Sequence, residues 1–197
     1  MDPVKAVPTL QSLKAMLQEQ APLRTRRELG FLMSDGSIPL HAGQVIEVLG
    51  KDQLAWSVRF LKERSQAKPL TPEVSTARVA WISSGLTEVF PMALAQEKIA
   101  LSRILFLERV KPEQGMEVLL SVLRSQLFEV LVFDQPLLPM RNLDAQMRKL
   151  QLTAEEGGSL MLLLSQKPTS SFGIHIQVVA EEQGQAHLRK VKGGTSE

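Results

Sequence analysis

The sequence predicts a doubly wound α/β fold, with a mainly parallel sheet, helices on both faces and a C-terminal antiparallel hairpin. Strand-like segments that are apolar on both faces alternate with helical segments, which is typical of a parallel sheet covered on both sides. Right-handed crossovers then distribute the helices over the two faces. Near the end of the chain, residues 174–180 and 186–192 are joined by the turn-like sequence EEQG, which predicts a hairpin at one edge of the sheet.

The alternating segments are short and well separated. The expected strands are residues 43–50, 78–84, 103–108, 129–134 and 160–166. Helical spacing of apolar residues predicts a helix over residues 53–65, and two more helices begin at prolines, which are pre-organised for a first helical turn. These two are a helix from Pro91 to about Leu101 and a helix from Pro112 whose apolar face includes Leu127. Asn142 is a candidate cap for a last helix that ends at two consecutive glycines.

The first 37 residues form an N-terminal appendage to a core of residues 38–197. Residues 9–20 predict a short helix with one apolar stripe, formed by Leu10, Leu13, Met16 and Leu17. The stripe is a candidate docking element for a partner, and packing on the protein's own core is the alternative. A basic cluster follows it, formed by Arg24, Arg26 and Arg27. This cluster is interpreted either as a solvated linker or as a contact for DNA phosphates or an acidic partner.

Composition limits the classes of function. The net charge is only +2 and no long basic run occurs, whereas non-specific nucleic-acid binding needs clustered lysine and arginine. Without cysteine, disulfides, thiolate nucleophiles and cysteine-based metal sites are excluded, and the three histidines are far apart in sequence. No apolar stretch approaches the roughly 20 residues that a membrane helix needs, and the N-terminus lacks a signal-peptide pattern. We therefore expect a cytoplasmic protein without metal, cofactor or membrane partner.

A phosphate-binding loop is expected where the first strand of the core ends, but its motif has decayed. The motif is G-x-x-x-x-G-K-[ST], and residues 50–57 read GKDQLAWS. Gly50 and Ser57 match the first glycine and the final hydroxyl. Ala55 replaces the second glycine and Trp56 replaces the lysine. The segment is therefore a vestigial phosphate-binding loop.

Each replacement removes a group that nucleotide binding needs. Tryptophan at position 56 lacks the cation that holds the β- and γ-phosphates, and Ala55 restricts a backbone that glycine would allow to wrap phosphate. Asp52 adds a negative charge beside the position of an anionic ligand. Lys51 is a candidate replacement cation, although its place beside Gly50 favours an exposed side chain. We expect Trp56 to pack against the sheet or to fill the vacated pocket, with base stacking as the alternative.

Asp134 ends an apolar strand, as the Mg²⁺-binding aspartate of the Walker B pattern does. A polar residue at this position also commonly caps a loop. Because the lysine is absent, we favour a structural or vestigial role for Asp134. Further candidate contact residues are Arg141 for DNA and, on the hairpin, Arg189, Lys190 and Lys192 for a partner. Charges on an edge strand also discourage aggregation.

The order of these elements resembles the core of the RecA recombinase family over about residues 38–193, and spacing agrees better than identity. Five segments carry the resemblance: IPLHAGQVIEVLG at 38–50, VAWISS at 79–84 with Pro91 after it, QMRKL at 146–150, LMLLLSQ at 160–166 and HLRKVK at 187–192. The resemblance implies a RecA-like fold.

The departures from that family are as informative as the matches. RecA carries a catalytic glutamate at the end of its second strand, where this chain has Ser84 or Gly85. Its two DNA-binding loops correspond here to residues 135–141 and 167–173, which are too short for the same grip on single-stranded DNA. The losses of the lysine, the glutamate and the loops together indicate a protein that acts by contact rather than by catalysis.

Short RecA-like proteins with these losses resemble the ImuA group of mutasome components and, more distantly, the SulA inhibitors of cell division. The ImuA resemblance implies a non-catalytic adaptor in the SOS response to DNA damage, which binds RecA, a Y-family polymerase relative, or both, during mutagenic translesion synthesis and DNA repair. Two alternatives stay open: a SulA-like inhibitor of cell division, and a residual RecA-type ATPase that uses Lys51 and Asp134. Self-association is also open.

Overall fold

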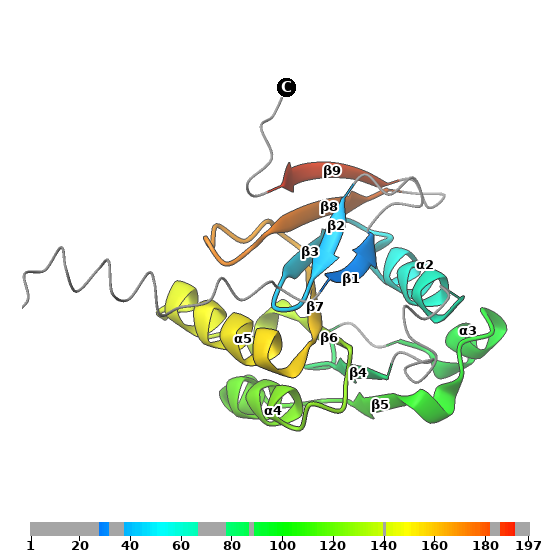
Figure 1. The fold of residues 1–197 in the computed structure, drawn as a ribbon, viewed down its shortest axis with the longest axis horizontal. Coiled ribbons are helices and arrows are strands. Elements are labelled where there is room, and N and C mark those ends of the chain that lie inside the picture. Colours follow the sequence, from blue (N-terminus) through cyan, green and yellow to red (C-terminus); the bar gives the residue numbers. More distant parts are fainter. Residues whose placement is uncertain are drawn as a thin grey trace, which may run out of the picture.

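The structure is a computed structural model that describes residues 28–31, 38–66, 78–86, 89–139, 141–181 and 186–191. Its centre is a seven-stranded sheet in the order β5-β4-β6-β7-β3-β8-β9 (Figure 1). The strands are β3 Val45–Leu49, β4 Val79–Ile82, β5 Ile104–Leu107, β6 Val130–Asp134, β7 Leu160–Ser165, β8 Ile176–Ala180 and β9 Ala186–Val191. All neighbours pair in parallel except β8 and β9, which are antiparallel. The mainly parallel sheet with its terminal hairpin confirms the predicted fold class.

The parallel strands bring several chain turns to one edge of the sheet. Leu49 at the end of β3 pairs with Ser165 at the end of β7, and Asp134 at the end of β6 pairs with Leu164. The loops that follow β3, β4, β6 and β7 therefore lie at the same, carboxyl-terminal edge. This is the edge at which open α/β sheets bind ligands.

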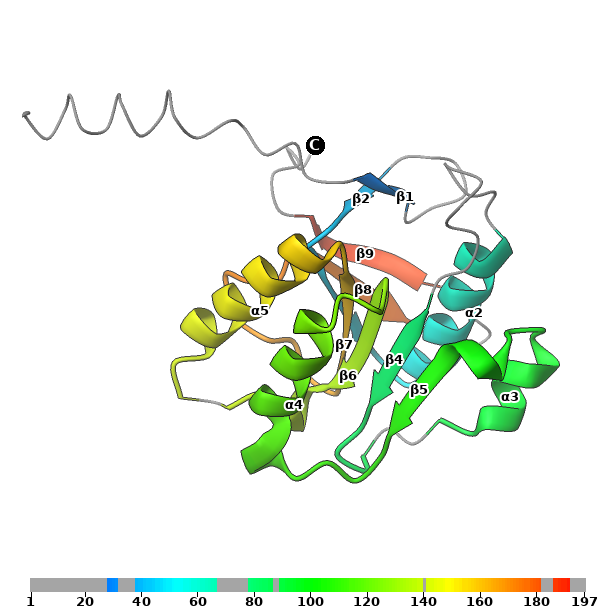
Figure 2. The ribbon, with the colours of Figure 1, turned by 60° about the horizontal axis from the view of Figure 1, so that its bottom comes forward.

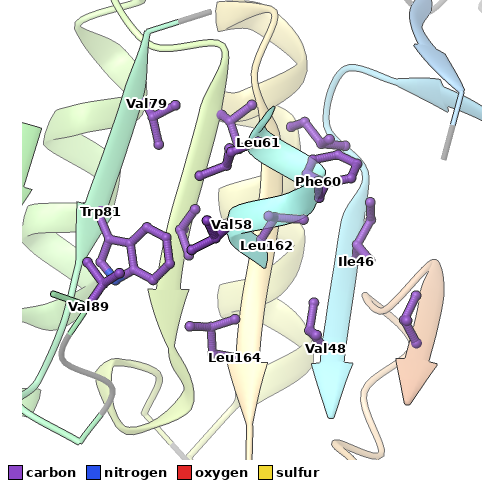
Figure 3. Close-up of a cluster of buried hydrophobic side chains, with 14 of the residues drawn as sticks. Ile46, Val48, Val58, Phe60, Leu61, Val79, Trp81, Val89, Leu162 and Leu164 are labelled. Atoms are coloured by element: carbon purple, nitrogen blue, oxygen red, sulfur yellow. The ribbon is translucent and has the colours of Figure 1, made fainter. Parts of the chain in front are cut away.

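Two helix layers cover the two faces of the sheet (Figure 2). The helices α2 Gln53–Gln66 and α3 Pro91–Gln96 contribute to one apolar core, and α4 Pro112–Arg124 and α5 Leu143–Gly157 contribute to the other. In the first core, Phe60 of α2 lies near Ile46 of β3, and Val58 lies near Leu162 of β7 (Figure 3). The central strands β3, β4, β6 and β7 are buried along their whole length, which explains their apolar sequences.

Two predicted helices end earlier than expected. The helix that begins at Pro91 ends at Gln96 instead of about Leu101, because Lys98 takes a left-handed conformation with φ of 61°. A short 3-10 turn, Leu101–Arg103, then leads into β5. In the same way α4 ends at Arg124, since Gln126 has a φ of 55°. Leu127 is consequently not on the helix and is 54% exposed, which corrects its assignment to the apolar face.

The cap predicted for α5 is also corrected. Asn142 stands at the N-cap position, but its backbone is left-handed with φ of 55° and its side chain makes no capping hydrogen bond. Asparagine tolerates this backbone conformation better than most residues. Asn142 therefore fits the left-handed turn before α5 and does not cap the helix with its side chain. The predicted end of the helix is confirmed, because Gly158 adopts a φ of 72° directly after α5.

A small antiparallel ladder precedes the main sheet and was not expected from the sequence. It consists of β1 Glu28–Phe31 and β2 Pro39–His41. Leu29 of β1 packs against the core that α2 covers. The predicted N-terminal helix with Leu10, Leu13, Met16 and Leu17, the basic cluster at residues 24–27, the hairpin turn at 182–185 and Lys192 lie outside the described residues. Among the described helices, none is long and apolar enough to span a bilayer.

Candidate functional site

The turn after β3 occupies the place of the expected phosphate-binding loop. Gly50 has a φ of 97°, and a Cβ there would lie 2.2 Å from the carbonyl oxygen of Ala180, the last residue of β8. Only glycine fits this conformation and this close approach. The neighbouring Lys51 and Ala55 are exposed. The turn is thus closely apposed to the end of the neighbouring strand.

Trp56, at the position of the motif lysine, belongs to the packing of α2. It is half-buried against the core, and its ring stacks on Phe60 with centroids 5.3 Å apart and planes 14° apart. The guanidinium of Arg64 lies 5.8 Å from the centroid of the Phe60 ring. Burial lowers the pKa of Arg64, and the charge of Glu129 partly opposes that shift. The side chain at position 56 therefore acts as an apolar packing group along α2.

Ser57, at the position of the motif hydroxyl, is fully buried. Its Oγ donates a hydrogen bond of 2.8 Å to the carbonyl oxygen of Gln53, one turn earlier in α2. Back-bonding of this kind is the usual way in which a buried serine is satisfied within a helix. The hydroxyl that would contact Mg²⁺ in an intact motif is here engaged inside the helix.

Asp134 is buried at the end of β6 and holds the loop that follows β4. The backbone N–H of Ser84 donates to both carboxylate oxygens, at 3.1 and 3.0 Å, and the Ser84 hydroxyl donates to Oδ2 at 2.8 Å. Ser83 Oγ lies 3.2 Å from Oδ2 and itself accepts from the N–H of Gly85 at 2.9 Å. This network fits the loop-capping interpretation of Asp134. Of the two residues that follow Ser83, Ser84 bonds directly to the carboxylate and Gly85 bonds to the Ser83 hydroxyl.

A buried carboxylate in the middle of the sheet was missed by sequence reasoning. Glu47 of β3 is fully buried. Its Oε1 accepts the backbone N–H of Thr169 at 2.9 Å, and its Oε2 accepts the side-chain amide of Gln177 at 2.7 Å. The available signal was a single glutamate inside an apolar strand that is covered on both faces, because such a charge requires buried hydrogen-bond donors.

The loop after β7 is held at several points besides Glu47. Asp144 Oδ1 accepts the Ser171 hydroxyl at 2.6 Å and the backbone N–H of Phe172 at 2.9 Å. The side-chain amide of Gln151 donates to the carbonyl oxygen of Gly173. Phe172 itself projects outward and is 79% exposed. Residues 167–173, which the sequence analysis compares with a DNA-binding loop of RecA and finds too short, thus form a loop fixed to β3 and α5.

The remaining predicted contact residues lie on separate elements. Arg141 is exposed in the turn before α5, and Arg189 is exposed on the edge strand β9. Lys190 pairs through its backbone with Gln177 of β8. Within the described part of the chain, no cluster of three or more histidine, aspartate or glutamate side chains has a geometry that could hold a metal ion.

No protein-family model matches the chain, and no curated protein matches it either.

Proposed function

We propose that the chain is a non-catalytic adaptor with a RecA-like fold, which acts in the cytoplasm during damage-induced translesion DNA synthesis. Its partners in this proposal are RecA recombinase, a Y-family polymerase relative, or both. The family assignment and the partners come from the sequence resemblance. The support for a non-catalytic role comes from the side chains of the site.

One observation carries the proposal. The side chains at the motif positions that would bind ATP and Mg²⁺ instead pack against the helix or cap a loop. Trp56 stacks on Phe60, the Ser57 hydroxyl bonds to its own helix, and both oxygens of Asp134 accept hydrogen bonds from the loop after β4. ATP hydrolysis needs a cation on the β- and γ-phosphates and a carboxylate available to Mg²⁺. These side chains therefore support a role in contact instead of phosphoryl transfer.

The partner prediction is tested by calorimetry with the purified full chain. Titration into RecA, and separately into a Y-family polymerase relative, is expected to give saturable binding to at least one of them. Binding to neither would reject the adaptor. Magnesium-dependent ATP turnover that is abolished by Asp134→Ala would instead support the residual ATPase.

The C-terminal hairpin is the partner surface that we assign within this proposal. On β9, Arg189 is exposed and Leu188 is 38% exposed, so the edge strand presents both charge and apolar area. Arg189→Glu is expected to weaken partner binding by up to about fivefold, because an exposed ion pair contributes up to roughly 1 kcal/mol. Arg148→Glu, at an exposed position of α5, is the matched control and is expected to bind like the unaltered chain.

Direct nucleic-acid binding is expected to be weak or absent in this proposal. The test is a mobility shift of single-stranded DNA at low and physiological salt. A salt-sensitive shift that is lost in Arg141→Glu would contradict this expectation and would assign the turn before α5 to DNA, because phosphate contacts are recognised by their salt dependence.

A further inference from the structure

A hollow lies at the amino-terminal ends of β4 and β5, where the sheet has one of its two edges (Figure 2). Its volume is about 550 Å³, which is within the range of small-molecule sites. Basic, hydroxyl and apolar side chains line it together, and these include Arg78, Ser102, Arg103, Leu105, Leu127 and Phe128. The turn after β3, with the vestigial phosphate-binding motif, lies at the opposite, carboxyl-terminal ends of the strands.

Strand register places the two arginines of the hollow side by side. Val79 of β4 pairs with Ile104 of β5 in a parallel ladder, and Arg78 and Arg103 directly precede these two residues. Neighbouring strands lie about 5 Å apart, so the two backbones hold like charges close together. Like charges opposite each other on neighbouring strands are destabilising. An anion bound between the two guanidinium groups would relieve that repulsion.

One acidic residue beside the arginines balances only part of their charge. The backbone N–H of Glu129 donates to the carbonyl oxygen of Arg78 at 2.9 Å, which places Glu129 on the side of β4 away from β5. The charge of Glu129 also acts on Arg64 at the end of α2. Its single charge is thus shared between two arginines. Arg103 has an interaction within the chain, but a guanidinium carries five N–H donors and can bind a ligand as well.

Two arginines and a hydroxyl match the chemistry of a phosphate monoester. Such a phosphate has three terminal oxygens and close to two negative charges at neutral pH. The planar fork of arginine binds phosphate oxygens in pairs, and the exposed Ser102 adds a hydroxyl donor next to Arg103. A carboxylate would bring only one charge to two cations. The lining therefore favours phosphate over carboxylate.

Exposed apolar side chains continue the hollow beside the arginines. Leu127 is 54% exposed and Leu105 is 37% exposed. Because α4 ends at Arg124, Leu127 lies beyond the helix and lines the hollow. Large apolar side chains that are exposed together commonly mark a binding site. They suit an aryl or alkyl group attached to the phosphate.

We propose that this hollow binds a small phosphate monoester with an apolar body. The phosphate lies between Arg78 and Arg103, and the apolar body lies against Leu105 and Leu127. The proposal is independent of the adaptor function, because the partner surface assigned to that function is on β9, at the other edge of the sheet.

Calorimetric titration of the full chain with naphthyl phosphate tests it, at a pH of about 8, where the probe is a dianion. Saturable binding is expected. Inorganic phosphate lacks the apolar body and naphthol lacks the phosphate, so each is expected to bind at least about tenfold more weakly. No saturable binding of naphthyl phosphate would overturn the proposal. Equally tight binding of naphthoate would overturn the choice of a phosphate.

Substitutions locate the site on the chain. Arg78→Gln and Arg103→Gln are each expected to weaken the binding of naphthyl phosphate at least about tenfold, because each removes charge-assisted hydrogen bonds. Arg148→Gln removes the same charge from an exposed position of α5 and is the matched control, with unchanged binding expected. Leu127→Ser is expected to weaken naphthyl phosphate about fivefold and to leave inorganic phosphate unchanged. Equal losses in Arg78→Gln and Arg148→Gln would overturn the proposal, since binding would then follow net charge alone. Circular dichroism of each variant verifies that the core is folded.

Discussion

Asp134 and Ser84 tie the ends of two neighbouring strands together. Both oxygens of the Asp134 carboxylate accept the backbone N–H of Ser84, and one of them also accepts the Ser84 hydroxyl. The carboxylate is buried, so these donors supply the hydrogen bonds that water would otherwise give. A residue at the Walker B position thereby organises the loop after β4.

Removing this carboxylate should cost stability. Asp134→Ala is expected to lower the free energy of unfolding by about 2–3 kcal/mol, since the Ser84 donors lose a charged acceptor. Asp134→Asn, which keeps one oxygen acceptor, is expected to lose less. Urea denaturation followed by circular dichroism measures both. An unchanged midpoint for Asp134→Ala would contradict the capping role.

Gly50 provides a second test of how the turn after β3 is built. Gly50→Ala combines an unfavourable φ of 97° with a Cβ placed 2.2 Å from the Ala180 carbonyl oxygen. We expect a loss of more than about 2 kcal/mol, beyond the roughly 1–2 kcal/mol of left-handed strain alone. Gly85→Ala is the matched control, because Gly85 has a φ of 102° but its nearest neighbour is 3.8 Å from an added Cβ. Equal losses for the two variants would show that the contact with Ala180 yields without cost.

The sequence predicts the layout of the sheet better than it predicts helix ends and side-chain partners. Apolar runs such as β6 and β7 are recognisable because burial on both faces excludes polar residues. The end of α3 was misplaced because Lys98 takes a left-handed backbone, which no side-chain pattern announces. Propensity gives little warning of such an end, since residues other than glycine adopt this conformation only when surrounding contacts support it.

The site was predictable only where local motifs define it. Substitution of the motif lysine by Trp56 is visible in eight residues of sequence, but the partner of Trp56 depends on the helical position of Phe60. The network of Glu47 joins residues separated by 122 and 130 positions. Such pairing follows from strand order, and apolar strands of similar length and composition do not reveal which of them are neighbours.

The Glu47 network should be needed for the order of the loop after β7. Glu47→Leu leaves the backbone N–H of Thr169 and the amide of Gln177 without their carboxylate acceptor. We expect a loss of about 2–3 kcal/mol in the free energy of unfolding, together with faster amide exchange at Thr169. Glu47→Gln retains one acceptor oxygen, so its free energy of unfolding is expected to lie between those of Glu47→Leu and the unaltered chain. Native-state hydrogen exchange by mass spectrometry measures the loop, and unchanged protection in Glu47→Leu would show that other contacts hold it.

Lys62 of α2 and Glu97, which follows α3, form a salt bridge of 2.6 Å. This pair should give a measurable dependence of stability on pH. The hydrogen bond and charge of Lys62 lower the pKa of Glu97, below the value of about 4.3 for an unfolded chain. A carboxyl group with a lowered folded pKa stabilises the fold above its unfolded pKa, and this contribution is lost as the pH falls through the folded pKa. Glu97→Gln is therefore expected to be less stable than the unaltered chain at pH 7, and the difference is expected to shrink as the pH falls below the unfolded pKa and through the folded pKa of Glu97. Urea midpoints at several pH values measure the difference.

A double-substitution cycle separates the pair from other effects of Glu97. In a Lys62→Gln background, Glu97→Gln is expected to change the midpoint much less at pH 7, because the partner that lowers the pKa of Glu97 is gone. Raising the salt concentration should also shrink the effect in the unaltered background, since both side chains are partly exposed and their attraction is screened. A difference between Glu97→Gln and the unaltered chain that persists undiminished at low pH would show that the stabilisation does not come from the ionised carboxylate.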